Sequence, residues 1–236
     1  MEVLVVIPTY NERENIRQLV TEIFSLPFEL RILIVDDASP DGTGKIADRL
    51  TAEDERVMVL HRGRKQGLGT AYIEGFTLGL KTEASYFLQM DADFSHSPEE
   101  ILRLLDGVKD ADMVVGSRYI KGSKILNWSI RRKLLSAMAN LLTRVILSIP
   151  IKDITSGFRI FRREVLESIA LKEIRAKGFA FQIEMLYHIY HDGFKIKEVP
   201  ITFTNRKKGG SKLVFGIIWE VLLTVVRLRL KRPKKL

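Results

Sequence analysis

The sequence contains no cysteine among its 236 residues. That absence excludes disulfide bonds, zinc sites built on thiolates and cysteine nucleophiles. The N-terminus also lacks the basic and apolar regions of a signal peptide and starts directly with a strand pattern, so we expect a cytoplasmic protein. Asn and Gln are scarce beside abundant Lys, Arg and Glu, a composition that is common in thermophilic proteins.

The net charge of +9 is confined to one part of the chain. Residues 205–236 contain ten Lys or Arg and a single acid, Glu220, whereas the preceding 204 residues contain 28 basic and 28 acidic residues. A neutral body with a basic, apolar tail favours a membrane-surface protein over a nucleic-acid binder. We therefore expect one domain at 1–204 and an appendage at 205–236.

Strand and helix patterns alternate through the first half of the chain, which is typical of a parallel sheet with crossover helices. We expect strands at 3–7, 31–35, 57–60, 85–90 and 112–115. The first strand is expected to end before Pro8, and the next helix to begin at Asn11, with Glu14 completing a capping box. A long amphipathic helix is expected at 131–149.

Two carboxylates follow the fourth predicted strand. Asp91 and Asp93 are two residues apart, so their side chains point the same way in an extended segment, beyond the sheet edge where α/β proteins bind ligands. Two neighbouring carboxylates repel each other unless a cation intervenes. A hard divalent ion that also binds phosphate oxygens would satisfy both. The alternative is a loop in which the two acids only cap and solubilise.

Other predicted strands end in polar or glycine-rich segments that belong to the same sheet edge. These segments are residues 8–12, 36–37, 62–70 and 116–119. Each alone is explained equally well as a strand end or a tight turn. Together, in this order, they favour a crevice for a nucleotide.

A C-terminal helix is expected from Leu213 to Leu230, with a length of about 27 Å. Its few polar or small positions lie three or four apart on one narrow stripe: Gly216, Glu220, Thr224, Arg227 and Lys231. The wide apolar arc and the basic residues after it favour a helix lying in a membrane interface. A spanning helix is the second choice because Glu220 near its middle costs about 2.5–3.5 kcal/mol. A core or dimer helix is the third.

Taken together, six motifs resemble those of the family-2 glycosyltransferases of the GT-A fold, and within them the polyprenol-phosphate mannosyltransferases. The motifs are residues 7–15, 35–43, 67–72, 90–96, 116–119 and 206–212. The resemblance covers the chain up to Lys212. It implies an α/β, Rossmann-like GT-A domain with a mostly parallel sheet and flanking helices, followed by a basic loop that closes over the donor and an amphipathic interface helix.

The resemblance also implies the substrates and the residues that hold them. The donor is GDP-mannose, the acceptor is dolichyl or another polyprenyl phosphate, and the cofactor is Mg²⁺ or Mn²⁺. The nucleoside is expected at Pro8, Tyr10, Glu12, Val35 and Asp37, and the diphosphate at Asp91, Ala92, Asp93, Lys177, Arg206 and Lys212. The metal is expected at Asp91, Asp93 and Ser95, and the acceptor phosphate at Arg118, Arg132 and Ser136. Asp91, Asp93 and Arg118 are the expected catalytic residues.

The implied reaction is an inverting transfer that gives dolichyl β-D-mannosyl phosphate. A lipid phosphate is already anionic, so it needs positioning more than a general base. We expect a peripheral protein on the cytoplasmic face of a membrane, attached by the C-terminal helix, by the apolar face within 134–146, or by a partner protein. Three alternatives stay open: UDP-glucose as donor, a phosphatase with Asp91 as nucleophile, and a basic-tailed membrane or RNA adaptor.

Overall fold

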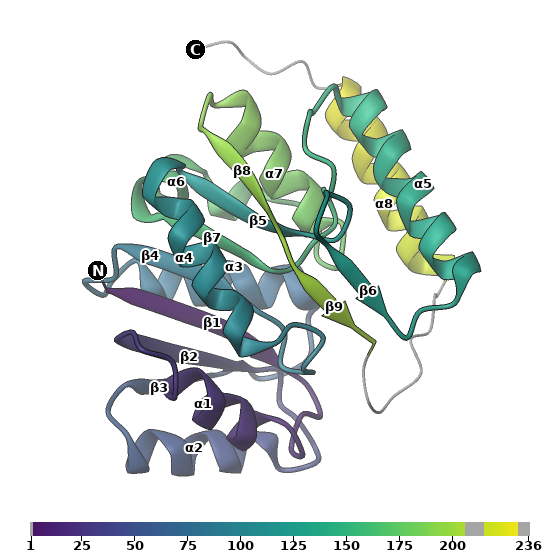
Figure 1. The fold of residues 1–236 in the computed structure, drawn as a ribbon. Helices are drawn as coiled ribbons and strands as arrows, with labels where there is room; N and C mark the ends of the chain where they lie inside the picture. Colours follow the sequence, from purple (N-terminus) through teal and green to yellow (C-terminus); the bar gives the residue numbers. More distant parts are fainter. Residues whose placement is uncertain (1, 206–214, 231–236) are drawn as a thin grey trace.

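The computed structural model describes residues 2–205 and 215–230, and its centre is a seven-stranded sheet between layers of helices (Figure 1). The strand order is β3-β2-β1-β4-β7-β5-β8. The strands are β1 (Val3–Thr9), β2 (Leu30–Asp36), β3 (Val57–His61), β4 (Tyr86–Gln89), β5 (Met113–Ser117), β7 (Arg159–Arg162) and β8 (Ile196–Pro200). Only β7 runs antiparallel to its neighbours in this sheet. The prediction of a mostly parallel α/β sheet is therefore confirmed.

Alternating side chains of the strands enter two cores, one on each face of the sheet. In β1, Leu4 and Val6 belong to one core, whereas Val3, Val5 and Ile7 belong to the other. The first core is covered by α3 (Leu68–Gly79), α6 (Arg163–Ser168) and α7 (Phe181–His191), and the second by α1 (Ile16–Phe24), α2 (Thr43–Glu53) and α4 (Ile101–Gly107). Burial on both faces explains why these strands are almost continuously apolar.

Two local predictions near the start of the chain are wrong. The strand β1 continues through Pro8 to Thr9, because Pro8 pairs with Val35 of β2 while pairing with β4 stops at Val6, so no neighbouring strand requires the missing N–H. The first helix begins at Ile16, not at Asn11. Asn11 has a left-handed backbone, with φ +62°, and belongs to the turn that precedes the helix.

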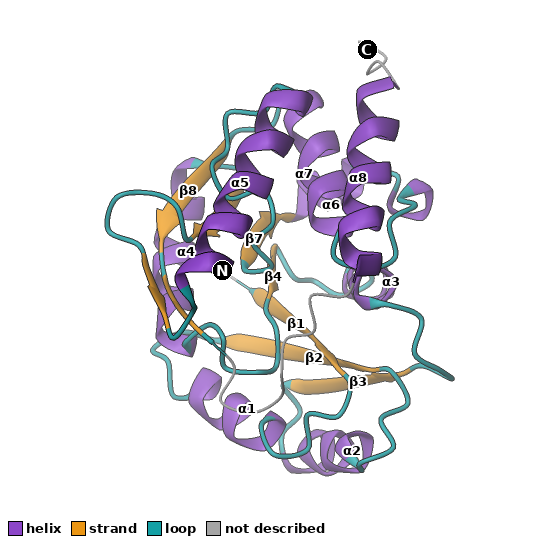
Figure 2. Cartoon of the chain, turned by 90° about the vertical axis from the view of Figure 1, so that its right-hand side faces the viewer, coloured by secondary structure: helices purple, strands orange, loops and turns teal. Residues whose placement is uncertain are grey.

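Two long helices, α5 (Ile130–Leu147) and α8 (Phe215–Leu230), lie side by side outside the sheet (Figures 1 and 2). In α8, Thr224, Val225 and Leu228 are buried against the protein, whereas Trp219 and Leu222 are among its exposed apolar residues. Glu220, Thr224 and Arg227 of the polar stripe therefore face the domain, and much of the apolar arc faces outward. Within the described residues, no helix has the length and apolar character needed to cross a membrane.

Shorter elements complete the chain. A small second sheet pairs β6 (Lys124–Leu126), which comes just before α5 in the sequence, with β9 (Thr202–Thr204), which comes long after it. Single 3-10 turns occur at Pro98–Glu100, Val108–Asp110 and Leu171–Glu173. The buried Glu100 accepts a hydrogen bond from the N–H of Thr202, at 2.9 Å, which ties β9 to the start of α4.

Candidate active site

The carboxyl ends of β1, β2 and β4 meet at one edge of the sheet. Thr9 stands in register with Asp36 at the end of β2, and the Thr9 hydroxyl donates to the Asp36 carboxylate at 3.0 Å. The N–H of Asp37 donates to the Thr9 carbonyl at 3.0 Å. Since β1 also pairs in parallel with β4, the segments 8–12 and 36–37 and the Asp91–Asp93 motif leave the sheet beside one another, where α/β proteins bind ligands.

Asp37 is held in place by Arg62, which follows β3 at the same edge. The two side chains form a buried ion pair, and Arg62 also donates to the Thr70 hydroxyl at 2.7 Å. Burial raises the pKa of Asp37, and the charge of Arg62 only partly opposes this effect. We did not predict a role for Arg62 from the sequence. Its position directly after a strand at the ligand edge was the available signal.

The remaining residues predicted to hold the nucleoside differ in their accessibility. The ring of Tyr10 is exposed, and the Lys65 ammonium lies 3.7 Å from its centroid. Glu12 belongs to the turn before α1, where its N–H donates to the Thr43 hydroxyl at 3.0 Å. Val35 is fully buried and pairs with Pro8 across the two strands, so its side chain packs in the core behind the segment of Tyr10 and Glu12.

Asp91 and Asp93 are both oriented by hydrogen bonds. The Tyr72 hydroxyl donates to Asp91 Oδ1 at 3.1 Å, and the N–H of Ser95 donates to Asp93 Oδ1 at 2.9 Å. The side chain of Tyr72 is fully buried, and burial together with the charge of Asp91 raises its pKa well above the ordinary value. The motif thus has a fixed geometry at the end of β4. In the phosphatase alternative the two acids would follow the first strand of the chain. Here they follow the fourth, which argues against that alternative.

The residues present fit a hard divalent ion that shares its coordination with a ligand. The part of the chain that the structure describes has no cluster of three or more His, Cys, Asp or Glu side chains placed to hold a metal. It offers two carboxylates, Asp91 and Asp93, with Ser95 adjacent. Mg²⁺ is commonly bound by one or two carboxylates, with substrate phosphates and water supplying the other ligands. The donor set therefore suits such an ion when a diphosphate is bound.

A polar layer lies beneath Asp91. Arg159 is fully buried and donates to the carbonyls of Gln182 and Ile154, at 2.8 and 2.6 Å. Burial lowers the pKa of Arg159 to about 9, although the charge of Asp153 acts in the opposite direction. Gly157 brings the backbone close to Asp91, since an added Cβ would lie 3.5 Å from Asp91 Oδ2. We did not predict this layer, because no short motif marks it.

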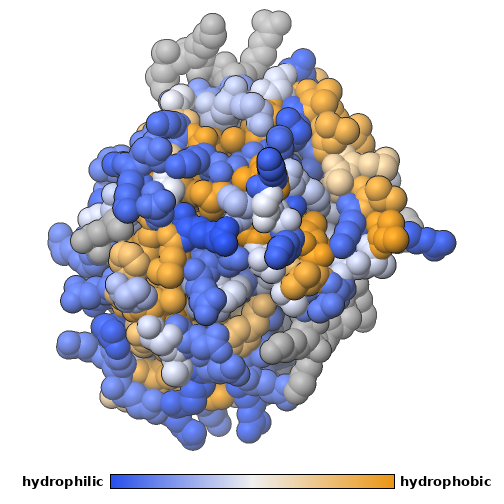
Figure 3. Space-filling view, viewed as in Figure 1, coloured by the Kyte–Doolittle hydropathy of each residue, from blue (hydrophilic) through white to orange (hydrophobic). Residues whose placement is uncertain are grey.

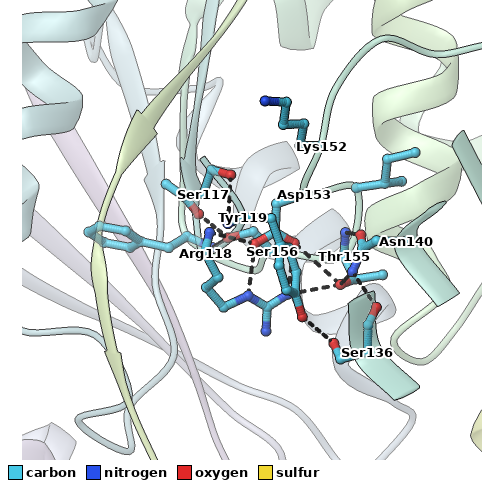
Figure 4. Close-up of polar contacts among 12 residues, drawn as sticks. Ser117, Arg118, Tyr119, Ser136, Asn140, Lys152, Asp153, Thr155 and Ser156 are labelled. Atoms are coloured by element: carbon cyan, nitrogen blue, oxygen red, sulfur yellow. Dashed lines mark hydrogen bonds and ion pairs between the residues drawn. The ribbon is translucent and has the colours of Figure 1, made fainter. Parts of the chain in front are cut away.

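Arg118 extends from the end of β5 and forms a network with a loop that follows α5 (Figure 4). Its Nε and Nη2 atoms donate to the two oxygens of Asp153, at 2.8 and 2.7 Å, and Nη2 also donates to the Thr155 hydroxyl. Asp153 is fully buried, which by itself raises its pKa, but the charge of Arg118 and the hydrogen bonds from Arg118 together outweigh burial and lower the pKa. We did not predict this partner of Arg118 from the sequence.

The three residues predicted to hold the acceptor phosphate are brought together around Trp128 and Tyr119. The guanidinium carbons of Arg132 and Arg118 lie 4.1 and 5.7 Å from the centroid of the Trp128 ring. The Tyr119 hydroxyl donates to Ser136 Oγ at 2.6 Å (Figure 4). Arg132 and Ser136 are one turn apart on α5, so this helix and the end of β5 together form a basic surface.

Lys177 lies beside the glycine-rich segment at 62–70, because its carbonyl accepts a hydrogen bond from the N–H of Gly69 at 2.8 Å. Ala92 is buried between the two acids of the motif. Arg206 and Lys212, which were also predicted to contact the donor, lie outside the described residues, as do eight of the ten Lys and Arg residues of the segment 205–236.

The sequence is similar to that of known glycosyltransferases. The model of the family described as "Glycosyl transferase family 2" matches residues 4–170. A polyprenol monophosphomannose synthase of Mycolicibacterium smegmatis is 48% identical over 98% of this chain and 89% of its own length. An undecaprenyl-phosphate mannosyltransferase of Micrococcus luteus is 45% identical over 96% of this chain and 93% of its own length.

Solved structures share the fold at lower sequence identity. A mannosyltransferase from Pyrobaculum calidifontis, solved in complex with GDP-Man and Mn²⁺, superimposes with a TM-score of 0.64. The alignment covers 98% of this chain and 65% of that one, with 14% identity. At this identity the similarity concerns the fold alone.

Proposed function

Because the chain belongs to glycosyl transferase family 2, we propose that it transfers mannose from GDP-mannose to a polyprenyl phosphate, such as dolichyl phosphate. The observation that carries this proposal is the 48% identity, over nearly the whole chain, to a polyprenol monophosphomannose synthase. The product is a polyprenyl β-D-mannosyl phosphate. Family membership also disfavours a non-enzymatic adaptor, since the family model matches the domain and not the basic tail.

The donor binds at the ends of β1, β2 and β4. The Asp37 carboxylate, kept in place by Arg62, accepts hydrogen bonds from the nucleoside, and the exposed ring of Tyr10 packs against it. Asp91 and Asp93 hold Mg²⁺ or Mn²⁺ together with the donor diphosphate, with Ser95 as a further ligand. When bound, the ion supplies positive charge for the diphosphate that departs. The mannosyltransferase from Pyrobaculum calidifontis, which binds GDP-Man and Mn²⁺, supports this assignment by its fold.

The acceptor phosphate binds between Arg118, Arg132 and Ser136. Arginine is suited to bidentate phosphate recognition, and the Asp153 ion pair holds the Arg118 guanidinium in one orientation. The lipid phosphate is ionised at neutral pH, so these residues place an oxygen in line behind the anomeric carbon without removing a proton. A single in-line displacement inverts the α linkage of the donor to a β linkage.

The acceptor carries a long hydrocarbon chain, and the surface of α5 and α8 fits a lipid interface. Exposed large apolar residues form one face of α5, and Figure 3 shows this band on the right of the molecule. They are Ile130, Leu134, Leu135, Met138, Leu141, Leu142, Val145 and Ile146. Contiguous apolar surface of this kind marks an interaction site. This surface supports our proposal that the protein is a peripheral membrane protein. Its position on the cytoplasmic face, and attachment through α8 or a partner protein, stay predictions from the sequence.

The experiment is transfer of radiolabelled mannose from GDP-mannose to a short polyprenyl phosphate, with and without EDTA. The expected result is mannolipid formation that stops when EDTA removes the metal and resumes with Mn²⁺ or Mg²⁺. UDP-glucose is the matched control donor and is expected to give no glycolipid. Transfer from UDP-glucose alone would overturn the donor, and no transfer from either donor would overturn the acceptor.

A further inference from the structure

The polar side of α8 reaches a loop that lies beside the donor edge, at residues 175–178. Glu220 Oε1 accepts a hydrogen bond from the N–H of Gly178 at 2.7 Å. A hydrogen bond to a charged acceptor is roughly twice as strong as one between neutral groups. The approach is close because residue 178 has no side chain: a Cβ there would lie 2.4 Å from Glu220 Oε2.

The same loop has a second anchor that does not involve Glu220. The buried carboxylate of Glu184, in α7, accepts from the N–H groups of Arg175 and Ala176 at 3.1 and 2.8 Å. Arg227 of α8 pairs with Glu184 at 2.7 Å. The first half of the loop therefore stays attached to α7 when Glu220 is removed, and only the Lys177–Gly178 end loses its support.

That end of the loop supports the first turn of α3. The Lys177 carbonyl accepts from the N–H of Gly69 at 2.8 Å, and a Cβ on Gly67 would lie only 2.4 Å from the same carbonyl. In the same turn, the Thr70 hydroxyl donates to the Gly67 carbonyl at 2.8 Å and accepts from Arg62 at 2.7 Å. Arg62 in turn holds Asp37. Continuous contacts thus connect α8 with the nucleoside side of the site.

We propose that Glu220 is a positioning residue for the donor nucleotide. Through Gly178 it holds the Lys177 carbonyl against Gly69, and so fixes the turn that carries Thr70 and supports Arg62 and Asp37. The inference rests on the proposed function, because the ligand that depends on this arrangement is the guanosine diphosphate part of GDP-mannose. Glu220 itself does not touch the reacting atoms.

The first test is GDP binding to the full chain by isothermal titration calorimetry, with Mn²⁺ present. Glu220→Ala is expected to raise the Kd for GDP about tenfold, the loss expected when one hydrogen bond to a charged group is removed. Glu220→Gln keeps an acceptor for the Gly178 N–H and is expected to stay within about threefold of the unaltered chain, because a neutral acceptor forms a weaker bond. Val226→Ala, at an exposed position on the same helix, is the matched control and should bind GDP normally.

Kinetics distinguish positioning from a general loss of structure. In Glu220→Ala the KM for GDP-mannose is expected to rise by a factor similar to that for Kd, while kcat and the KM for the lipid phosphate change little. A merely structural role would lower the active fraction and reduce kcat with no change in KM. That outcome would overturn the proposal.

Gly178→Ala provides a second test that does not depend on removing Glu220. The added methyl group displaces the Glu220 carboxylate, so this variant is expected to weaken GDP binding as Glu220→Ala does. In the double variant the second change should add nothing, because both remove the same contact. Additive losses, or normal GDP binding in both single variants, would overturn the inference. Failure of the unaltered chain to bind GDP would instead overturn the proposed function.

Discussion

The Arg118 guanidinium and the Asp153 carboxylate form a two-point ion pair that joins the end of β5 to the loop after α5, with Asp153 fully buried. The Arg118 N–H also donates to Asp153, at 2.9 Å. One carboxylate therefore fixes both the backbone and the side chain of Arg118. This guanidinium and that of Arg132 both lie near the ring of Trp128, with their carbons 5.7 and 4.1 Å from its centroid.

Asp153→Asn is expected to destabilise the protein by about 3–5 kcal/mol, because it leaves a buried guanidinium without its charge partner. The free energy of unfolding in urea measures this loss. Asp106→Asn, which removes an exposed carboxylate paired with Lys109, is the matched control and should change stability little. Equal losses in the two variants would show that burial of the Asp153 pair has no special effect.

Asp91→Asn and Asp93→Asn are each expected to lower kcat by about 10³-fold, because several kcal/mol of charge stabilisation depend on them. Both variants should also bind Mn²⁺ more weakly in the presence of GDP, which titration calorimetry measures. The exposed Asp110, paired with Lys197, provides the control variant Asp110→Asn. An Asp91→Asn enzyme with undiminished transfer would contradict the metal assignment.

Tyr72→Phe tests whether the orientation of Asp91 matters. The change removes one hydrogen bond to Asp91 and keeps the ring, which stacks on Phe181 with centroids 6.0 Å apart. We expect a loss of about 1 kcal/mol of stability and a roughly tenfold fall in kcat/KM. Tyr86→Phe, at the other end of β4, should leave kcat/KM unchanged. A normal kcat/KM in Tyr72→Phe would mean that Asp91 needs no support from this hydroxyl.

The sequence predicts the sheet, most elements and the position of Asp91 and Asp93, because these depend on local patterns. Alternating strand and helix periods are local, and so is an acid pair directly after a strand. The ion pairs that hold Arg118 and Arg62 were not predictable in the same way. Asp153 lies 35 residues from Arg118, and Asp37 lies 25 residues from Arg62. Which of many charged side chains meets a given arginine is decided by tertiary packing.

The same reason explains what the sequence left open about α8. Its polar stripe was identified, but whether the stripe faced solvent or the domain depended on partners far away in the chain. Glu220 meets Gly178 and Arg227 meets Glu184, both more than 40 residues away. The predicted start of α1 is wrong for a local reason: Asn11 adopts a left-handed turn, which overrides its preference for a capping position.

The apolar face of α5 leads to a prediction about membrane binding. Leu134→Asp with Leu141→Asp is expected to reduce co-sedimentation with anionic vesicles by more than about 100-fold, since each buried leucine contributes about 1.5–3 kcal/mol. Both side chains are more than half exposed, so thermal stability should change little. Phe28→Asp, at an exposed apolar residue far along the chain from α5, is the control. Unchanged vesicle binding would remove α5 from the membrane surface.

The buried side chain of His96 is expected to make the free energy of unfolding depend on pH. It is buried and stacked on Phe158, with ring centroids 4.7 Å apart, and burial followed by the charge of Arg118 lowers its pKa to about 4. As the pH falls below 6.5, His96 becomes protonated in the unfolded chain, whereas in the folded protein it stays neutral down to about pH 4. The contribution of His96 to the free energy of unfolding should therefore be constant well above pH 6.5 and lower by about 2 kcal/mol at pH 5.

Urea unfolding of the unaltered protein and of His96→Gln, from pH 8 to pH 5, measures this contribution as a difference. The slope between pH 6.5 and 5 should be smaller in His96→Gln, because glutamine takes up no proton in either state. The comparison is needed because other groups also titrate: burial lowers the pKa of His191, which adds to the slope, and raises that of Asp37, which acts against it. Both groups are present in both proteins, so their effects cancel. If the two proteins lose stability in parallel, protonation of His96 is not what destabilises the fold in this pH range.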